Sequence, residues 1–191
     1  ITLRSDKIFK HKLGTKQDED VLVYFEKDET YNVEVAKSKS RKYLAIESGS
    51  TLTTEYRILE ADNPDGKFRV FQKRVRGLEY SINHYGDSFY IMTNADKATN
   101  FKLMKTLETA TSKENWTEVV PHREDVLLED IEIFKDFLVV EERFNGLNRI
   151  RIIPWSGIGE YYLPFDSETY TAYTSANVDF DSDILRYSYQ S

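Results

Sequence analysis

The sequence predicts an all-β fold, a partial β-propeller with about four blades' worth of four-stranded antiparallel sheets. Three observations predict it. The 191 residues include 13 Tyr, 11 Phe and 2 Trp but only 8 Gly and 4 Pro, and aromatic residues suit the half-buried, pleated surface of a strand. Strand-like runs recur with a period of about 47 residues, which is typical of a propeller blade. Turn residues stand between these runs, where an antiparallel chain has to reverse.

Four aligned positions mark the repeat, and each lies in the second of the four strands expected per blade. These positions are Tyr43, Phe89, Phe137 and Leu185. The expected first strands are residues 31–36, 80–85, 127–134 and 170–176. The expected second strands are residues 41–46, 87–92, 135–140 and 183–187. The expected third strands are residues 55–59, 100–104 and 148–153, and the fourth are residues 68–72, 116–120 and 160–163.

Short connections rich in Gly, Asn, Asp and Pro separate the expected strands. They lie at residues 63–66, 85–87, 145–146 and 157–159. Such residues favour tight reversals, so the connections predict antiparallel meanders. The WD dipeptide and the glycines of kelch repeats are absent, which indicates a propeller class with a degenerate repeat.

The two ends of the chain match only parts of a blade. Residues 7–13 and 20–25 correspond to the last two strands, whereas residues 170–189 supply the first two. We therefore expect one propeller domain over residues 1–191. Its parts are a half blade at 7–26, whole blades at 30–74, 79–122 and 127–165, and a half blade at 170–191.

Half blades leave strand edges without partners, and such edges invite pairing. We expect the two half blades to complement each other, either within one chain as a small closed ring or between two chains as a dimer. The chain begins at Ile1 without Met and ends in an aromatic run. This suggests a piece of a longer protein.

The composition of the chain excludes or disfavours several classes of binding partner and ligand. The net charge of −7 disfavours binding to nucleic acid, and no apolar run is long enough to span a membrane. No cysteine is present, and His11, His84 and His122 are too scattered for a metal-ligand spacing. We therefore expect no metal and no cofactor, and we expect these histidines at the surface or on strand edges. The residues 179–183 (DFDSD) are expected to form a turn, because the Gly and distal Glu of a calcium loop are missing.

Several strings in one order carry a family resemblance. They are KHKLGT at 10–15, DVLVYFEKD at 20–28, KSKSRKY at 37–43, ADNPDG at 61–66, HYGD at 84–87, VPHR at 120–123, EER at 141–143 and LRYSY at 185–189. Together they resemble the propeller of the prolyl oligopeptidase family, in particular the oligopeptidase B (protease II) branch. The resemblance implies a seven-bladed propeller joined to a C-terminal α/β-hydrolase domain that cleaves oligopeptides after Arg or Lys.

The catalytic residues of that family are not in this chain. A serine peptidase of this type needs a nucleophile elbow, G-x-S-x-G, together with a His and an Asp. No G-x-S-x-G occurs, and Ser48-Gly49-Ser50 follows an expected strand without a helix after it. We therefore expect no catalytic residue and no hydrolysis by this chain alone, whereas the parent protein is expected to be a serine-type endopeptidase.

The resemblance implies that the propeller caps the active site and admits only short peptides. By repeat position, six polar residues of the first strands are candidates for the lining of the substrate channel. These are Asn32, Glu34, Ser81, Asn83, Glu129 and Thr171. The alternative is that they belong to ordinary solvated strand faces. A basic cluster is expected on a solvated edge strand, with contact to the catalytic domain as the alternative, and it consists of Arg69, Lys73, Arg74 and Arg76.

Two functional hypotheses follow. The first is a non-catalytic gating segment of a serine oligopeptidase, with the hydrolase domain and oligopeptide substrates as partners. The second is a stand-alone propeller module for protein interaction, with no peptidase attached. Because no pattern of a secretory signal precedes the first strand, we expect a cytoplasmic location. The periplasm stays open as an alternative, because a chain without cysteine tolerates either compartment.

Overall fold

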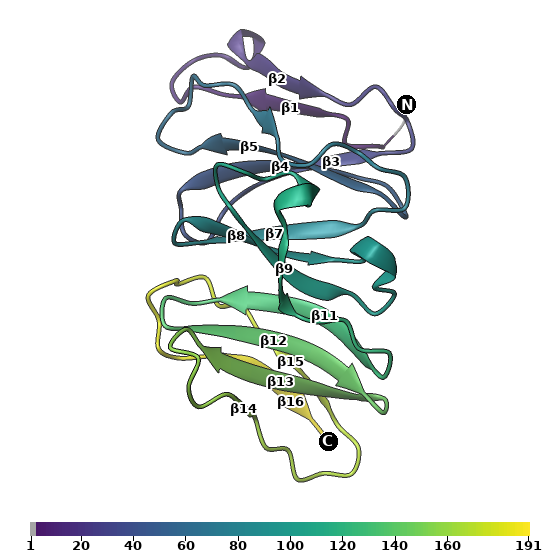
Figure 1. Cartoon of the computed structure of the whole chain (residues 1–191). Coiled ribbons are helices and arrows are strands. Elements are labelled where there is room, and N and C mark those ends of the chain that lie inside the picture. Colours follow the sequence, from purple (N-terminus) through teal and green to yellow (C-terminus); the bar gives the residue numbers. More distant parts are fainter. Residues whose placement is uncertain (1–2) are drawn as a thin grey trace. The chain divides into compact units, whose positions relative to one another are not determined.

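A computed structural model describes residues 3–191, and almost all of its regular structure is β-strand (Figure 1). The chain divides into two compact units, Ile1–Glu79 and Tyr80–Ser191. Three short 3-10 helices interrupt the strands: η1 (Gln17–Glu19), η2 (Ala95–Lys97) and η3 (Lys113–Asn115). Among the described residues, no helix has the length and apolar character needed to cross a membrane. The predicted all-β class is confirmed.

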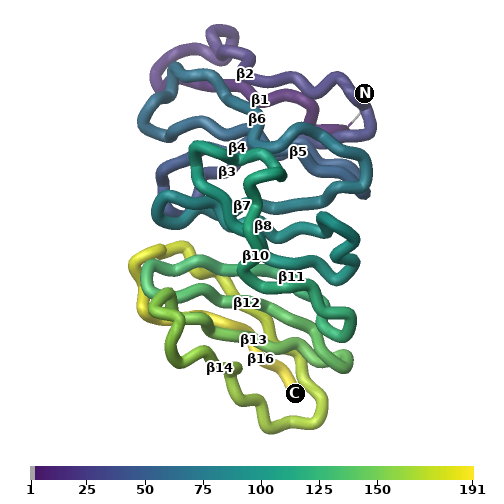
Figure 2. The backbone as a smooth tube through the Cα atoms, viewed as in Figure 1, coloured from purple at the N-terminus to yellow at the C-terminus, as the bar shows by residue number. Residues whose placement is uncertain are grey.

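The first unit contains two antiparallel sheets. The smaller one pairs β1 (Lys7–Lys10) with β2 (Val21–Phe25). The larger one is a meander of β3 (Asn32–Lys37), β4 (Tyr43–Gly49), β5 (Thr54–Glu60) and β6 (Arg69–Val70). Neighbours in sequence are neighbours in the sheet, as the path of the backbone shows (Figure 2). The core of this unit gathers on the central strands, where Ile46 of β4 and Ile58 of β5 are almost completely buried.

The second unit contains three antiparallel sheets. One is formed by β7 (Tyr80–Tyr85), β8 (Ser88–Thr93), β9 (Lys102–Leu107) and β10 (Thr117–Val120). The next is formed by β11 (Val126–Ile133), β12 (Phe137–Phe144), β13 (Leu147–Pro154) and β14 (Tyr161–Tyr162). The last pairs β15 (Thr171–Thr174) with β16 (Tyr187–Gln190). The predicted four-stranded antiparallel sheets are therefore present.

The sheet of β11 to β14 is covered on both faces. Successive side chains of a strand point to opposite faces, and Leu138, Val139 and Val140 of β12 are all fully buried. Leu138 and Val140 belong to the apolar core shared with Tyr90 of the β7–β10 sheet. Val139 belongs to a second core that includes Ala172 of β15. Each sheet in this unit thus buries its apolar face by stacking on the next one.

Some predicted strands differ in their bounds from the structure: those at 68–72 and 160–163 shorten to Arg69–Val70 and Tyr161–Tyr162, and one begins late. The repeat predicts a strand at residues 183–187, but β16 begins at Tyr187. Leu185 still packs against the core around Ala172, so the aligned position is correct as a core position. The N–H of Arg186 instead donates to Asn177 Oδ1 at 2.8 Å, while its carbonyl accepts from Asn177 Nδ2 and from the N–H of Ser175, each at 2.9 Å. The Asn177 side chain thus accepts the hydrogen bond of the Arg186 N–H, and the pairing of β16 with β15 begins at Tyr187.

Candidate functional site

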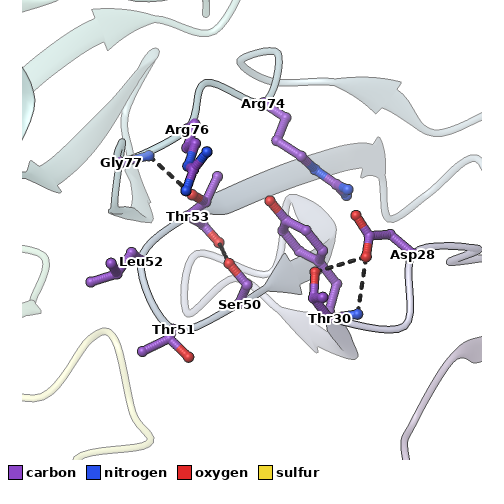
Figure 3. Close-up of a pocket in the computed structure, with 10 residues that line it drawn as sticks. Asp28, Thr30, Ser50, Thr51, Leu52, Thr53, Arg74, Arg76 and Gly77 are labelled. Carbon is purple, nitrogen blue, oxygen red and sulfur yellow. Dashed lines mark hydrogen bonds between the residues drawn. The ribbon is translucent and has the colours of Figure 1, made fainter.

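An open pocket of about 740 Å³ lies in the first unit (Figure 3). Its walls come from three chain segments: the one after β2, the turn between β4 and β5, and the one after β6. The lining residues are Asp28, Thr30, Tyr31, Ser50, Thr51, Leu52, Thr53, Arg74, Arg76 and Gly77. The volume falls within the range of pockets that bind small ligands.

The β4–β5 turn is fixed to the segment after β6. Within the turn, the N–H of Ser50 donates to the carbonyl of Thr53 at 2.9 Å. The N–H of Gly77 donates to Thr53 Oγ1 at 3.1 Å, and the N–H of Thr54 donates to the carbonyl of Leu78 at 3.0 Å. Gly77 has a φ of 83°, a left-handed conformation that favours glycine. These bonds hold one wall of the pocket in place.

Asp28 forms another part of the wall. Its Oδ1 accepts hydrogen bonds from the N–H of Thr30 at 3.0 Å and from the Thr30 hydroxyl at 2.7 Å. These bonds lower the pKa of Asp28 below its usual value. The carboxylate is therefore charged at neutral pH and already engaged by its own turn.

Arg74 reaches from the segment after β6 to the segment after β2. Its Nη2 donates to Glu26 Oε2 at 2.6 Å and lies 3.3 Å from Ser48 Oγ. The guanidinium also lies over the ring of Tyr31, 3.7 Å from the ring centroid, which is a cation–π geometry. Glu55 adds a weaker contact, 3.7 Å from Arg74 Nη2. The Arg74 cation is therefore balanced by carboxylates beneath the pocket.

Glu26 is the buried centre of this network, with 5% of its surface exposed. Burial by itself raises the pKa of a carboxyl group. Hydrogen bonds from Arg74, the Ser48 hydroxyl, the N–H of Asp28 and the Tyr24 hydroxyl outweigh that effect and lower the pKa of Glu26 to about 2. Glu26 therefore stays ionised, and the four donors connect β2, β4 and the segment after β6.

Arg76 differs from Arg74. It is exposed, and we find no hydrogen bond or ion pair between it and another residue of the described range 3–191. Arg74 and Arg76 lie on one side of the pocket, with Ser50 and Thr51 on the opposite side (Figure 3). The pocket thus presents one neutralised and one unpaired guanidinium.

The sequence-predicted channel residues lie elsewhere. Asn32 and Glu34 are exposed on one face of β3, and Ser81 and Asn83 are half-buried on one face of β7. Thr171 is exposed on β15. None of these residues lines the pocket. Their orientation toward a channel stays a prediction.

Glu129, the sixth channel candidate, is half-buried at an irregularity in β11. Its carboxylate accepts from Arg143 Nε and from Asn148 Nδ2, each at 2.7 Å. Its charge is therefore balanced within its own sheet. The pocket does not include this residue either.

The expectation for the basic cluster is only partly correct. Arg69 is exposed on the edge strand β6, but Lys73, Arg74 and Arg76 lie beyond this strand, and Arg74 is ion-paired with a buried carboxylate. His84 lies on the edge strand β7, one of the two locations expected for it, but its side chain is buried, with only 3% exposed. Its ring packs edge-on against Phe89, and its Nε2 lies 3.2 Å from Glu108 Oε2.

The sequence contained no signal for the pocket as a whole. Its walls come from three separate segments, and none of them has a recognisable motif. The one available signal was a glutamate directly after the apolar run of β2, since a carboxylate next to a strand core requires a partner. Arg74 is that partner.

Comparison with known proteins identifies the fold. Residues 2–191 match the family described as "Prolyl oligopeptidase, N-terminal beta-propeller domain". The chain belongs to this family. The predicted prolyl oligopeptidase resemblance and the predicted propeller are both confirmed.

Individual relatives include members named for the predicted oligopeptidase B (protease II) branch. It is 40% identical to dipeptidyl aminopeptidase BI of Pseudoxanthomonas mexicana over 100% of the chain and 26% of that relative. It is 29% identical to protease 2 of Moraxella lacunata over 98% of the chain and 26% of the relative. The structure of oligopeptidase B from Trypanosoma brucei, a closed form with covalently bound antipain, matches with a TM-score of 0.91 and 29% identity. That match covers 98% of this chain and 28% of the other. The prolyl oligopeptidase propeller described here thus spans about a quarter of the length of these relatives.

Proposed function

We propose that this propeller is the non-catalytic part of a serine oligopeptidase of the oligopeptidase B type. In this proposal it caps the active site of a C-terminal α/β-hydrolase domain and restricts access to short peptides that are cleaved after Arg or Lys. The observation that supports it is the family match over residues 2–191, together with relatives that are named as peptidases and are much longer than this chain. We assign peptide-bond hydrolysis to the C-terminal hydrolase domain because this chain contains no G-x-S-x-G.

The channel is proposed to run along the first strands of the blades. We assign residues 1–191 to one propeller domain with half blades at 7–26 and 170–191, and whole blades at 30–74, 79–122 and 127–165. The polar side chains proposed for the channel are Asn32, Glu34, Ser81, Asn83, Glu129 and Thr171. Pairing of the two half blades, within a chain or in a dimer, and a cytoplasmic location belong to the same proposal.

A second candidate concerns the cleavage mode. The chain is 40% identical to a relative named dipeptidyl aminopeptidase BI and 29% identical to one named protease 2. The higher identity favours a parent that releases dipeptides from the amino end of a peptide. Both candidates share the same non-catalytic role for this domain.

The test uses the full-length protein in which residues 1–191 occur, beside the 191-residue chain. The substrates are a naphthylamide of a basic dipeptide, a ten-residue peptide with internal Arg, and a folded protein. We expect the full-length protein to cleave both small substrates and to leave the folded protein intact, while the 191-residue chain cleaves none. Release of intact dipeptides selects the second candidate. A full-length protein that has no hydrolase domain and cleaves nothing would instead identify a stand-alone interaction module.

A further inference from the structure

One guanidinium in the pocket of the first unit, that of Arg76, has no hydrogen-bond or ion-pair partner among the described residues. Arg74 is paired with Glu26 at 2.6 Å, and the carboxylate of Asp28 is engaged by Thr30. Glu55 pairs with Arg57 at 2.6 Å. Arg76 has no such partner among the described residues and faces the pocket. The Arg76 guanidinium is therefore available to bind an anionic group of a ligand.

Two further donors belong to the walls of this pocket, one on Arg74 and one on Thr51. Nε of Arg74 is buried and has no hydrogen-bond partner within residues 3–191. A buried donor without a partner is uncommon in proteins and costs free energy. Thr51, exposed at the opposite wall, offers a hydroxyl near the same space (Figure 3). Because Arg74 Nε is buried, the donors that a ligand can reach are those of the exposed Arg76 and Thr51, on opposite sides of the pocket.

The chemistry of the walls selects the kind of anion. Guanidinium groups bind carboxylate and phosphate with similar geometry. Asp28, which is charged, also lines the pocket, and like charges repel a dianion more than a monoanion. Leu52, 63% exposed, adds an apolar surface beside the polar groups. A carboxylate attached to an apolar residue fits these walls better than a phosphate does.

We propose that this pocket binds the carboxylate of a peptide, through Arg76 with support from Arg74 and Thr51, while Leu52 contacts an apolar side chain of the same peptide. The carboxylate is the carboxyl terminus or an acidic side chain. The role of this site rests on the proposed function, because its ligands are the peptides that the parent peptidase is proposed to admit. Its test measures binding alone, so its failure is distinguishable from a failure of the peptidase assignment.

The test is titration of the isotope-labelled 191-residue chain, followed by NMR at neutral pH after the dispersion of amide signals has shown that the chain is folded. The probes are Ala-Ala-Ala-Leu as free acid, the same peptide as carboxamide, and acetyl-Ala-Glu-Ala-Leu-amide. We expect the free acid to shift the Arg76 Nε–H signal and the amides of Thr51, Leu52 and Gly77. We expect the carboxamide to bind at least tenfold more weakly. Binding of the Glu-containing peptide identifies an acidic side chain as a second source of the carboxylate.

Arg76→Gln is the main variant, because Arg76 is exposed and its loss leaves the buried network intact. Arg69→Gln is the matched control: it makes the same charge change at an exposed residue of β6 outside the pocket. We expect Arg76→Gln to weaken binding of the free acid at least tenfold and Arg69→Gln to change it less than twofold. Equal binding of acid and carboxamide, equal losses in the two variants, or no binding of any probe would each overturn the proposal.

Discussion

Arg74 Nη2 donates to Glu26 Oε2 across 2.6 Å and thereby connects the segment after β6 to the end of β2. The two residues are distant in sequence, and the carboxylate is almost completely buried. The pair therefore joins the small sheet of the first unit to its meander. Because the desolvated carboxylate depends on this one cation and three neutral donors, its replacement has a predictable cost.

Glu26→Gln is expected to lower the free energy of unfolding by about 3 kcal/mol, since it leaves the Arg74 cation without its main partner in a buried site. Glu29→Gln makes the same chemical change at an exposed position of the same segment and is expected to change the stability by less than about 0.5 kcal/mol. Urea denaturation followed by circular dichroism measures both. Similar values for the two variants would contradict the role given to the buried pair.

The same carboxylate predicts how stability depends on pH. The pKa of Glu26 is lowered from 4.5 to about 2 in the folded chain, so the unfolded chain binds its proton first as the pH falls. The stabilisation is complete above pH 4.5, decreases as the pH falls from 4.5 toward 2, and is lost below about 2. Denaturation midpoints measured from pH 6 to pH 2 are expected to fall less steeply for Glu26→Gln than for the natural sequence. Parallel curves would show that other groups cause the acid sensitivity.

An aromatic stack should stabilise the second unit. The rings of Tyr85 and Trp155 lie 4.3 Å apart at an interplanar angle of 15°, and Trp155 Nε1 donates to the carbonyl of Phe134 at 2.9 Å. Trp155→Phe keeps a ring but loses the hydrogen bond, with an expected cost of about 1 kcal/mol. Trp155→Ala removes the ring as well, with an expected cost of about 3 kcal/mol. Chemical denaturation of both variants tests this order, and equal costs would be evidence against a contribution from the stack.

If Thr171 lines the proposed channel, a bulky side chain at this position should slow the cleavage of long peptides more than that of short ones. Thr171→Trp introduces a large side chain at an exposed candidate position of β15, whereas Thr99→Trp does so at an exposed connection between β8 and β9. In the full-length protein, we expect Thr171→Trp to lower kcat/KM for a ten-residue peptide about tenfold and for a dipeptide naphthylamide much less. Thr99→Trp should leave both values unchanged. If the two variants behave alike, Thr171 does not line the route of the substrate.

The all-β fold was predictable because its signals are local. Alternating side chains, aromatic positions and turn residues are each visible within a few residues of sequence. The repeat predicted that Tyr43, Phe89 and Phe137 occupy equivalent strands of successive sheets, and they lie in β4, β8 and β12. Leu185 shows the limit of this approach. It occupies the expected core position, but the strand begins later because the side chain of Asn177 bonds the backbone of Arg186.

The pocket was not predictable, because it depends on which distant segments meet. Arg74 and Arg76 are two positions apart and look alike in sequence, yet one is tied to Glu26 and the other is exposed and unpaired within the described residues. His84 follows the same logic: it is buried opposite Phe89 on the neighbouring strand, a pairing that its own sequence segment does not show. Charged and polar side chains are usually exposed, but a side chain that finds a partner in the fold can be buried, and the sequence does not show which ones do.

The strand β12, buried on both faces, limits how this domain can be exchanged between relatives. Leu138 and Val140 belong to one core and Val139 to another, so a swapped β12 would have to fit the neighbouring sheets on both sides at once. A chimera that breaks the chain inside residues 126–154 combines two incompatible packings. Recombination points in the connection between β10 and β11, or after β14, keep the sheet of β11 to β14 whole. Blades of different proteins are therefore best joined at these connections.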